Sequence, residues 1–154
     1  MPDKSLATIP SVIFDLDGTL ANASTRRIFL EKSPKNWEAF FAGIEYDPPN
    51  MPVLNLYRLI SETKRHQMIL VSGRPEKCRD ASLIWLSKNN ISFDMFFMRA
   101  NNDRRPDHLV KEEILYEIQK LGYSVEFAVD DRNSVVKMWR KNGITCFQCD
   151  DGNF

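Results

Sequence analysis

Several features are scarce in this chain of 154 residues, and each scarcity argues against a class of protein. Three cysteines are an odd number, which argues against a disulfide framework. With two histidines in the whole chain, the C-x-x-C at Cys146–Cys149 lacks the second ligand pair of a zinc site. No apolar run approaches the roughly 18 residues of a membrane span, and the N-terminal stretch lacks the apolar region of a signal peptide. We therefore expect reduced, partly buried cysteines in a cytoplasmic protein without membrane contact.

An excess of charge of one sign is also missing. The chain has 21 basic residues (Lys and Arg) and 21 acidic residues (Asp and Glu). Any polyanion would therefore have to bind through a local basic patch. The hydrophobic share of 43% and charged share of 27% are ordinary for a globular protein. The length predicts a single domain over residues 1–154, and nothing in the sequence indicates an obligate protein partner.

Short apolar runs and helix-like segments alternate along the chain. The runs do not alternate polar with apolar residues, which is typical of buried strands, and they lie at Ser11–Asp15, Gln67–Ser72, Asp94–Arg99, Val125–Asp130 and Ile144–Gln148. The helices expected after them are Pro52–Arg65, Pro75–Asn89, Asp107–Leu121 and Asn133–Lys141. Asp107 is the expected N-cap of the third helix. This order predicts an α/β fold with a doubly wound, mostly parallel five-stranded sheet.

Residues 21–50 fit this alternation least well. The segment contains Trp37, Phe40 and Phe41, and we expect it to form a small excursion over the active-site edge, with a short helix over Lys35–Ala42. Two interpretations are open: the excursion is a lid over the site, or its aromatic residues pack as a small satellite core. Either way the protein has a minimal cap or none.

Carboxylates gather where the first predicted strand ends. Asp15 and Asp17 flank Leu16 directly after the apolar run Val12-Ile13-Phe14, and Gly18 then allows a sharp turn. A core strand has no structural use for two adjacent acids, because unpaired buried charge is costly. The pattern therefore indicates chemistry.

Two further strand ends carry polar groups, Ser72-Gly73-Arg74 and Asp130-Asp131-Arg132. Ligands of open parallel sheets bind at the carboxyl ends of the strands, so these groups should meet the first pair. Four acids close together would repel one another unless a cation lay among them. Oxygen ligands alone favour a hard ion such as Mg²⁺, which predicts a metal site formed by Asp15, Asp17, Asp130 and Asp131.

The neighbouring groups suit a phosphate. Ser72 and the backbone N–H of Gly73 can donate hydrogen bonds to phosphoryl oxygens, and Arg74 offers a planar fork. Lys111, in the first turn of the Asp107 helix, can place a cation beside them. The sequence therefore predicts phosphoryl transfer through an aspartyl-phosphate, because it offers a carboxylate nucleophile, a second carboxyl, a metal site, a hydroxyl and a cation.

These residues, in order, resemble the four motifs of the haloacid dehalogenase-like (HAD) phosphohydrolases: Asp15-Leu16-Asp17-Gly18-Thr19-Leu20, Ser72, Lys111 and Asp130-Asp131. The resemblance implies that Asp15 is the nucleophile and Asp17 the acid/base. It implies that Thr19 supports the turn and that Ser72 and Lys111 hold the phosphoryl group. Mg²⁺ would be held by Asp15, Asp130 and the backbone carbonyl of Asp17, with Asp131 supporting the site.

Within that superfamily the chain resembles the 3′-phosphatase domain of bacteriophage polynucleotide kinase–phosphatases. The resemblance is carried by Val71-Ser72-Gly73-Arg74, by Asp107–Ile114 and by Asp130-Asp131-Arg132. It implies that Arg26, Arg74 and Asp107 belong to the substrate-binding site, and Arg132 lies in a segment that should reach it. No G-x-x-x-x-G-K-[S/T] occurs, so the kinase half is not expected and the chain would act as a stand-alone phosphatase.

Three functional hypotheses follow. The first is a Mg²⁺-dependent 3′-phosphatase acting on nucleic acid ends or nucleotides. The alternative is a 5′-nucleotidase or another phosphatase of small phosphometabolites. The third, a HAD-fold protein that only binds a partner, is weakened because every catalytic motif is present. An open site would accept a bulky polynucleotide end, and Arg104 and Arg105 lie where they could contact its backbone phosphates.

Overall fold

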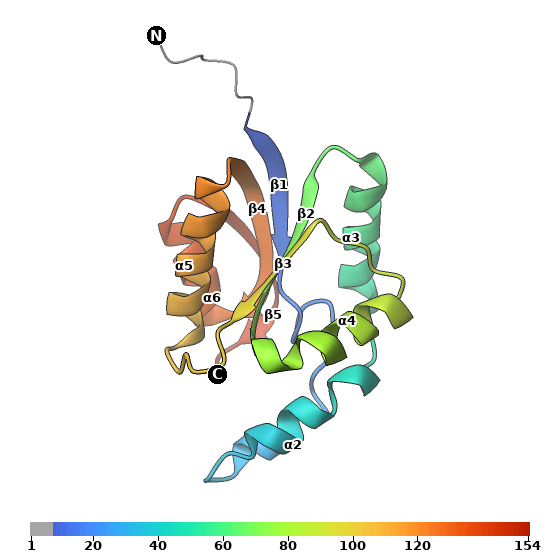
Figure 1. Cartoon of the computed structure of the whole chain (residues 1–154), viewed down its shortest axis with the longest axis vertical. Helices are drawn as coiled ribbons and strands as arrows, with labels where there is room; N and C mark the ends of the chain where they lie inside the picture. The colour runs from blue at the N-terminus through green and yellow to red at the C-terminus, as the bar shows by residue number, and fades with distance from the viewer. Residues whose placement is uncertain (1–7) are drawn as a thin grey trace.

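The computed structural model describes residues 8–154, and its core is a single five-stranded sheet covered on both faces (Figure 1). The strands lie in the order β3-β2-β1-β4-β5, and every neighbouring pair is parallel. Their bounds are Ile9–Phe14 (β1), Gln67–Pro75 (β2), Met95–Arg99 (β3), Tyr123–Arg132 (β4) and Thr145–Gly152 (β5). The predicted α/β fold with a five-stranded parallel sheet is confirmed.

Four helices cover the sheet. Met51–Thr63 (α3) and Arg79–Lys88 (α4) lie on one face, whereas Asp107–Lys120 (α5) and Asn133–Lys141 (α6) lie on the other (Figure 1). Side chains of β1 alternate between the two resulting cores: Val12 and Phe14 belong to the first, and Ile13 to the second. Because both faces are buried, the strands read as continuous apolar runs in the sequence.

The order of the strands places the site. The chain runs outward from β1 to β2 and β3, then returns to the other side of β1 to form β4 and β5. The connections after β1 and β4 therefore diverge, and the carboxyl ends of these two neighbouring strands flank a crevice, which is the general ligand site of open α/β sheets. Asp15 follows β1, and Asp130 and Asp131 lie at the end of β4.

The predicted start of α4 and the predicted N-cap of α5 are wrong. β2 continues through Pro75 and is followed by a 3-10 turn at Glu76–Cys78 (η2), so α4 begins at Arg79. In α5 the N-cap is Pro106, and Asp107 is the first helical residue without a side-chain capping bond. The Asp107 carboxylate instead accepts a hydrogen bond from Arg99 and pairs with Arg132. Tertiary ion pairs have therefore taken the place of the local cap.

The segment between β1 and α3 is a small helical excursion. It contains Ile28–Glu31 (α1), Trp37–Ala42 (α2) and the 3-10 turn Ile44–Tyr46 (η1), and it projects beyond the carboxyl-terminal edge of the sheet (Figure 1). The predicted helix is present but begins at Trp37, because the side chain of Asn36 caps it by accepting from the Ala39 N–H. Over residues 8–154, no helix has the length and apolar content needed to cross a bilayer.

Candidate active site

The first predicted carboxylate, Asp15, lies in a tightly held turn. Its backbone N–H donates to the Val129 carbonyl at 3.1 Å, which extends the contact of β1 with β4 by one residue. The Thr19 hydroxyl donates to Asp15 Oδ2 at 3.0 Å. Gly18 has a φ of 81°, and a Cβ there would lie 2.1 Å from Asp131 Oδ2. Glycine is therefore required both by the turn and by the approach of the second acidic strand end.

Lys111 links two strand ends. From the first turn of α5 its ammonium group contacts Asp15 Oδ1 and Asp130 Oδ2, both at 2.9 Å, and the side chain is 1% exposed. Burial acts to lower the pKa of Lys111, but Asp130 and Asp15 outweigh it and raise that pKa well above its usual value. Lys111 therefore remains a cation inside the site.

Three carboxylates form a cluster that is fit for a hard cation. Asp15, Asp130 and Asp131 each offer an oxygen within 4.8 Å of the others, and all three are buried. Burial, and then the charge of Asp130, raises the pKa of Asp15 well above its usual value and that of Asp131 to about 6. The donors are all oxygens, and one divalent ion would relieve their mutual repulsion, so the cluster fits a hard cation such as Mg²⁺.

Asp17 differs from Asp15 although both were predicted as metal-binding aspartates. Its carboxylate accepts from Arg74 Nη2 at 2.5 Å and Nε at 3.1 Å, and from Arg26 Nη2 at 2.6 Å. Burial opposes ionisation, but Arg74 and then Arg26 outweigh it and hold the pKa of Asp17 well below its usual range. The side chain of Asp17 thus lies outside the three-acid cluster, and a metal contact through its backbone carbonyl stays a prediction.

Asp47 is a site residue that the sequence did not reveal. It accepts from Arg26 Nε at 2.8 Å and from Arg26 Nη2 at 2.6 Å, in a pair that is almost wholly buried. Its own backbone carbonyl accepts from the indole N–H of Trp85 at 2.7 Å. The only sequence signal for Asp47 was an acid in the turn-rich stretch before α3, which is ordinary for a surface loop.

The remaining predicted substrate-binding residues lie around the same edge. The Ser72 hydroxyl oxygen accepts from the Arg74 N–H at 3.1 Å, which leaves its hydrogen available to a ligand. A Cβ on Gly73 would lie 2.0 Å from Asp107 Oδ1, so glycine permits β2 to meet α5 closely. Asp107 is held by Arg99 at 2.7 Å and Arg132 at 3.3 Å. Arg26 and Arg74, in contrast, are both committed to Asp17.

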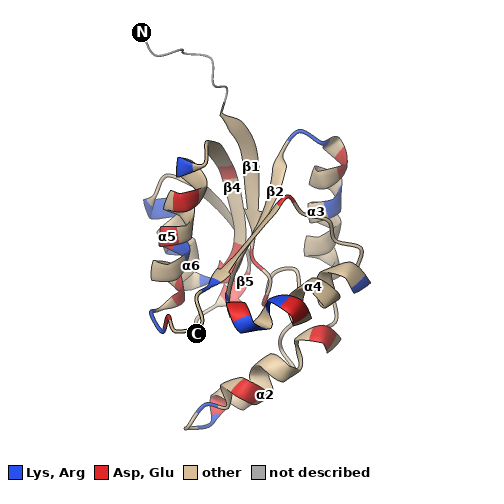
Figure 2. Cartoon of the chain, in the orientation of Figure 1, with Lys and Arg blue, Asp and Glu red and all other residues tan. Residues whose placement is uncertain are grey.

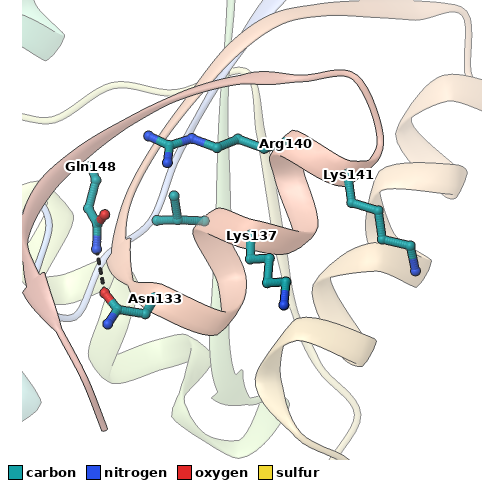
Figure 3. Close-up of a pocket in the computed structure, with 6 residues that line it drawn as sticks. Asn133, Lys137, Arg140, Lys141 and Gln148 are labelled. Carbon is teal, nitrogen blue, oxygen red and sulfur yellow. Dashed lines mark hydrogen bonds between the residues drawn. The ribbon is translucent and has the colours of Figure 1, made fainter.

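A cavity of about 730 Å³ is lined by most of the predicted site residues: Asp15, Asp17, Gly73, Arg74, Asp107, Lys111, Asp130, Asp131 and Arg132. This volume is within the roughly 300–1,000 Å³ typical of ligand sites. Thr19, Arg26 and Ser72 are buried and do not line the cavity. Acidic residues lie at the end of the sheet, and Lys or Arg residues occur in the turn before α2 and the loop before α5 (Figure 2). A second hollow, along α6 and β5, is lined by Lys137, Arg140 and Lys141 and by no acid or nucleophile (Figure 3). The first cavity is therefore the candidate active site.

The fold is that of the HAD-like hydrolases. The parallel sheet is matched by a hydrolase from Streptococcus pneumoniae (20% identity, TM-score 0.62, covering 91% of this chain and 92% of that one). At that identity the likeness shows the fold alone.

The particular family is shown by a match over residues 10–154: the chain belongs to the polynucleotide kinase PNKP phosphatase domain family. A chain in the structure of the Pnkp1/Rnl/Hen1 RNA repair complex is 34% identical with a TM-score of 0.82, and the match covers 99% of this chain and 46% of that one. A protein of Autographa californica nuclear polyhedrosis virus, described as a bifunctional polynucleotide kinase/RNA ligase, is 28% identical over 131 residues. That match covers 84% of this chain and 18% of the viral protein, so the chain spans half or less of these relatives.

Proposed function

We propose that this phosphatase is a Mg²⁺-dependent phosphomonoester hydrolase that removes 3′-phosphates from nucleic acid ends through an aspartyl-phosphate. The proposal is carried by two aspartates that line one cavity and have different partners. Asp15 is bound by Lys111, whereas Asp17 is bound by Arg74 and Arg26. Two aspartates in opposite electrostatic environments suit two different roles.

The metal would be held by Asp15, Asp130 and the backbone carbonyl of Asp17, with Asp131 supporting it. When bound, the ion would neutralise charge on the phosphoryl oxygens and orient the phosphorus towards Asp15. Trp139 supports this arrangement from α6, because its indole N–H donates to Asp130 Oδ2 at 3.3 Å. That bond and the Lys111 contact fix the Asp130 carboxylate in one orientation.

In the first step a carboxylate oxygen of Asp15 attacks phosphorus, and the bond from phosphorus to the leaving 3′-oxygen breaks. Protonated Asp17 gives its proton to that oxygen. In the second step Asp17 takes a proton from water, whose oxygen attacks the same phosphorus and releases inorganic phosphate and free Asp15. Ser72, the Gly73 N–H and Lys111 bind the phosphoryl oxygens in both steps. Thr19 keeps the attacking carboxylate aligned through its hydrogen bond.

Arg26, Arg74, Asp107 and Arg132 complete the proposed substrate-binding set. A phosphoryl dianion entering the cavity competes with Asp17 for the guanidinium groups of Arg26 and Arg74. Each hydrogen bond transferred to the substrate would weaken the hold on the Asp17 carboxylate and favour its protonation for the acid step.

Family membership supports a nucleic acid end as the substrate, and the RNA repair complex of one relative supports RNA ends. That relative occurs in a complex with Rnl and Hen1, so a larger assembly is a proposal for this protein as well. A 5′-nucleotidase or another small-phosphometabolite phosphatase stays the alternative, because the same catalytic groups would serve any phosphomonoester.

The discriminating experiment measures phosphate release from a 3′-phosphorylated oligonucleotide, a 5′-phosphorylated one, and 3′- and 5′-mononucleotides. We expect the highest kcat/KM on the 3′-phosphorylated oligonucleotide, in DNA or RNA form. Asp15→Asn is the matched control and should abolish release from every substrate while the protein stays folded. A clear preference of the wild type for the 5′-mononucleotide would favour the alternative, and near-normal turnover by Asp15→Asn would overturn the covalent route.

A further inference from the structure

Part of the lining of the active-site cavity is formed by two aromatic rings, of which Trp37 is exposed and Phe41 is half-buried. Trp37 and Phe41, one helical turn apart on the same side of α2, both line the cavity. Their rings stack with centroids 5.8 Å apart and an interplanar angle of 26°, and Trp37 is 48% exposed. We call this pair the aromatic shelf. A half-exposed tryptophan at the mouth of a catalytic cavity is available to stack on a ligand, unlike the buried Trp85 and Trp139.

The aromatic shelf is fixed relative to the reacting centre by a chain of contacts. Trp37 packs edge-on against Phe40, with ring centroids 5.8 Å apart. Phe40 is buried, and the Arg26 guanidinium lies over its ring at 4.5 Å. Arg26 in turn donates to Asp17 at 2.6 Å. A ligand that stacks on the shelf is thereby positioned with respect to the proposed acid/base.

Two lysines lie beside the aromatic shelf, and a further cation lines the same cavity. Lys35 Nζ lies 5.8 Å from the Trp37 ring centroid, and Lys77 Nζ lies 5.8 Å from that of Phe41. Both lysines line the cavity, as does Arg104 in the loop before α5, and none of the three pairs with a carboxylate among residues 8–154. The cavity lining thus offers flat rings and positive charge without a carboxylate partner, which complement the bases and phosphodiesters of a nucleic acid strand.

We propose that the aromatic shelf binds the nucleobases next to the 3′-phosphate of a single-stranded end, while Lys35, Lys77 and Arg104 bind the adjoining phosphodiesters. This inference rests on the proposed function, and it identifies the aromatic shelf as the part of the site that selects single-stranded ends. A base that stacks on a protein ring must first leave its own base stack, so a single-stranded end fits the aromatic shelf. Stacking tolerates any base, so we expect weak sequence preference.

The first test is the steady-state kinetics of Trp37→Ala on a 3′-phosphorylated single-stranded oligonucleotide. We expect KM to rise roughly 5- to 100-fold with little change in kcat, because stacking contributes to binding and not to the reaction. A second oligonucleotide of the same length lacks bases at the nucleotides nearest the 3′-phosphate. On this substrate the KM values of Trp37→Ala and wild type should differ less than twofold. Trp37→Phe should restore most of the affinity.

The matched control is Tyr46→Ala. Tyr46 belongs to the same excursion and is 79% exposed, but it does not line the cavity, so its removal should leave KM unchanged. Added salt should raise KM for the wild type and less steeply for Lys35→Gln, because fewer phosphate contacts release fewer counterions. Circular dichroism of each variant separates an effect on the shelf from a loss of folding.

A binding measurement keeps the inference testable without turnover. In the Asp15→Asn protein with Mg²⁺, a 3′-phosphorylated oligonucleotide should quench the fluorescence of exposed Trp37 and leave that of Trp85 and Trp139, both fully buried, unchanged. If wild type hydrolyses the oligonucleotide and Trp37→Ala does so with the same KM, the proposed role of the aromatic shelf is wrong, but the proposed function stands. Wild type that hydrolyses mononucleotides and no 3′-phosphorylated oligonucleotide would overturn the proposed function, and the shelf with it.

Discussion

At the scale of single residues, environment separates side chains of identical type. Asp15 lies among carboxylates and one lysine, and its pKa is raised, whereas two guanidinium groups lower the pKa of Asp17. The two carboxylates are two positions apart in the chain but contact different cations, Lys111 in one case and Arg26 with Arg74 in the other. Neither arrangement is encoded in the local sequence alone, because each cationic partner comes from a distant segment.

The buried pair of Arg26 with Asp47 predicts a stability effect. Asp47→Ala would leave a guanidinium that is 3% exposed with fewer acceptors, so we expect the free energy of unfolding to fall by about 3 kcal/mol, the lower end for a broken buried pair. kcat should also fall, because Arg26 contacts Asp17. Urea denaturation and phosphate release measure the two effects.

Glu45→Ala is the matched control for Asp47→Ala. Glu45 is two positions away and lies 4.0 Å from Lys88 in a more exposed pair, so its loss should cost at most about 1 kcal/mol and leave kcat unchanged. Equal stability of the two variants would mean that Arg26 is held without Asp47.

Residue-level prediction from the sequence succeeded where a residue follows a strand. Asp15, Ser72 and Asp130 each lie at the end of a recognisable apolar run, so their convergence followed from the topology of a parallel sheet. The contact of Arg26 with Asp17 could not be predicted, because Arg26 and the Asp47 that holds it come from the excursion, where no periodic pattern specifies the backbone path. Arg74 was expected to contact phosphate, and the structure places its donors on Asp17 and Ser82.

At the scale of elements, β2 and α5 meet at a contact that only glycine permits. A Cβ on Gly73 would overlap the Asp107 carboxylate, which Arg99 and Arg132 hold in place. We therefore expect Gly73→Ala to displace Asp107 and lower kcat/KM roughly 10- to 100-fold, because a displacement of about 1 Å in an active site has that effect. Steady-state kinetics on the preferred substrate checks the prediction.

Gly122→Ala separates this effect from a general loss of stability. Gly122 has a φ of 93°, and no other group lies within 4 Å of the position that a Cβ would take, so the substitution strains the backbone far from any site residue. Its melting temperature should fall while kcat/KM stays near that of wild type. A Gly73→Ala enzyme with normal kcat/KM would show that Asp107 tolerates displacement.

Element boundaries were predicted less well than elements. The strands and the helices α3 to α6 lie where the apolar runs and the helical periodicity indicated them. α1 was missed because its four residues are too few for periodicity to be visible, and none of them is buried. The start of α4 was placed too early because Pro75, typical of a first helical turn, here ends β2.

At the scale of the whole molecule, the acidic cluster predicts that Mg²⁺ and pH act together on stability. Burial and the neighbouring Asp130 raise the pKa of Asp131 from 3.8 to about 6. The folded protein therefore keeps this proton up to about pH 6, whereas the unfolded chain releases it near pH 4. Without a divalent cation, this group makes stability fall as pH rises through that interval.

A Mg²⁺ ion held by this cluster, as we propose, would bind its ionised form, so the stabilising effect of Mg²⁺ should grow over the same interval. Melting temperatures measured with Mg²⁺ and with EDTA should nearly coincide at about pH 4 and separate above about pH 6. Asp130→Asn should remove most of the separation. A constant difference at every pH would mean that the ion binds elsewhere, and phosphate release in EDTA would contradict a metal-dependent reaction.

The isolated bridges that join Asp17 to Ala21 and Ala21 to Pro49 bring the two ends of the excursion together at the edge of the sheet. The excursion is therefore a closed loop whose outer part is exchangeable, since both attachment points persist whatever lies between them. Arg26 and Asp47 lie just inside those points and must be kept, because Asp47 holds Arg26 and Arg26 donates to Asp17. Phe40 must be kept as well, because its ring and its backbone carbonyl both contact the Arg26 guanidinium. Replacing the rest of residues 28–42 would alter the wall of the cavity while the aspartates at the strand ends and Lys111 of α5 stay unchanged.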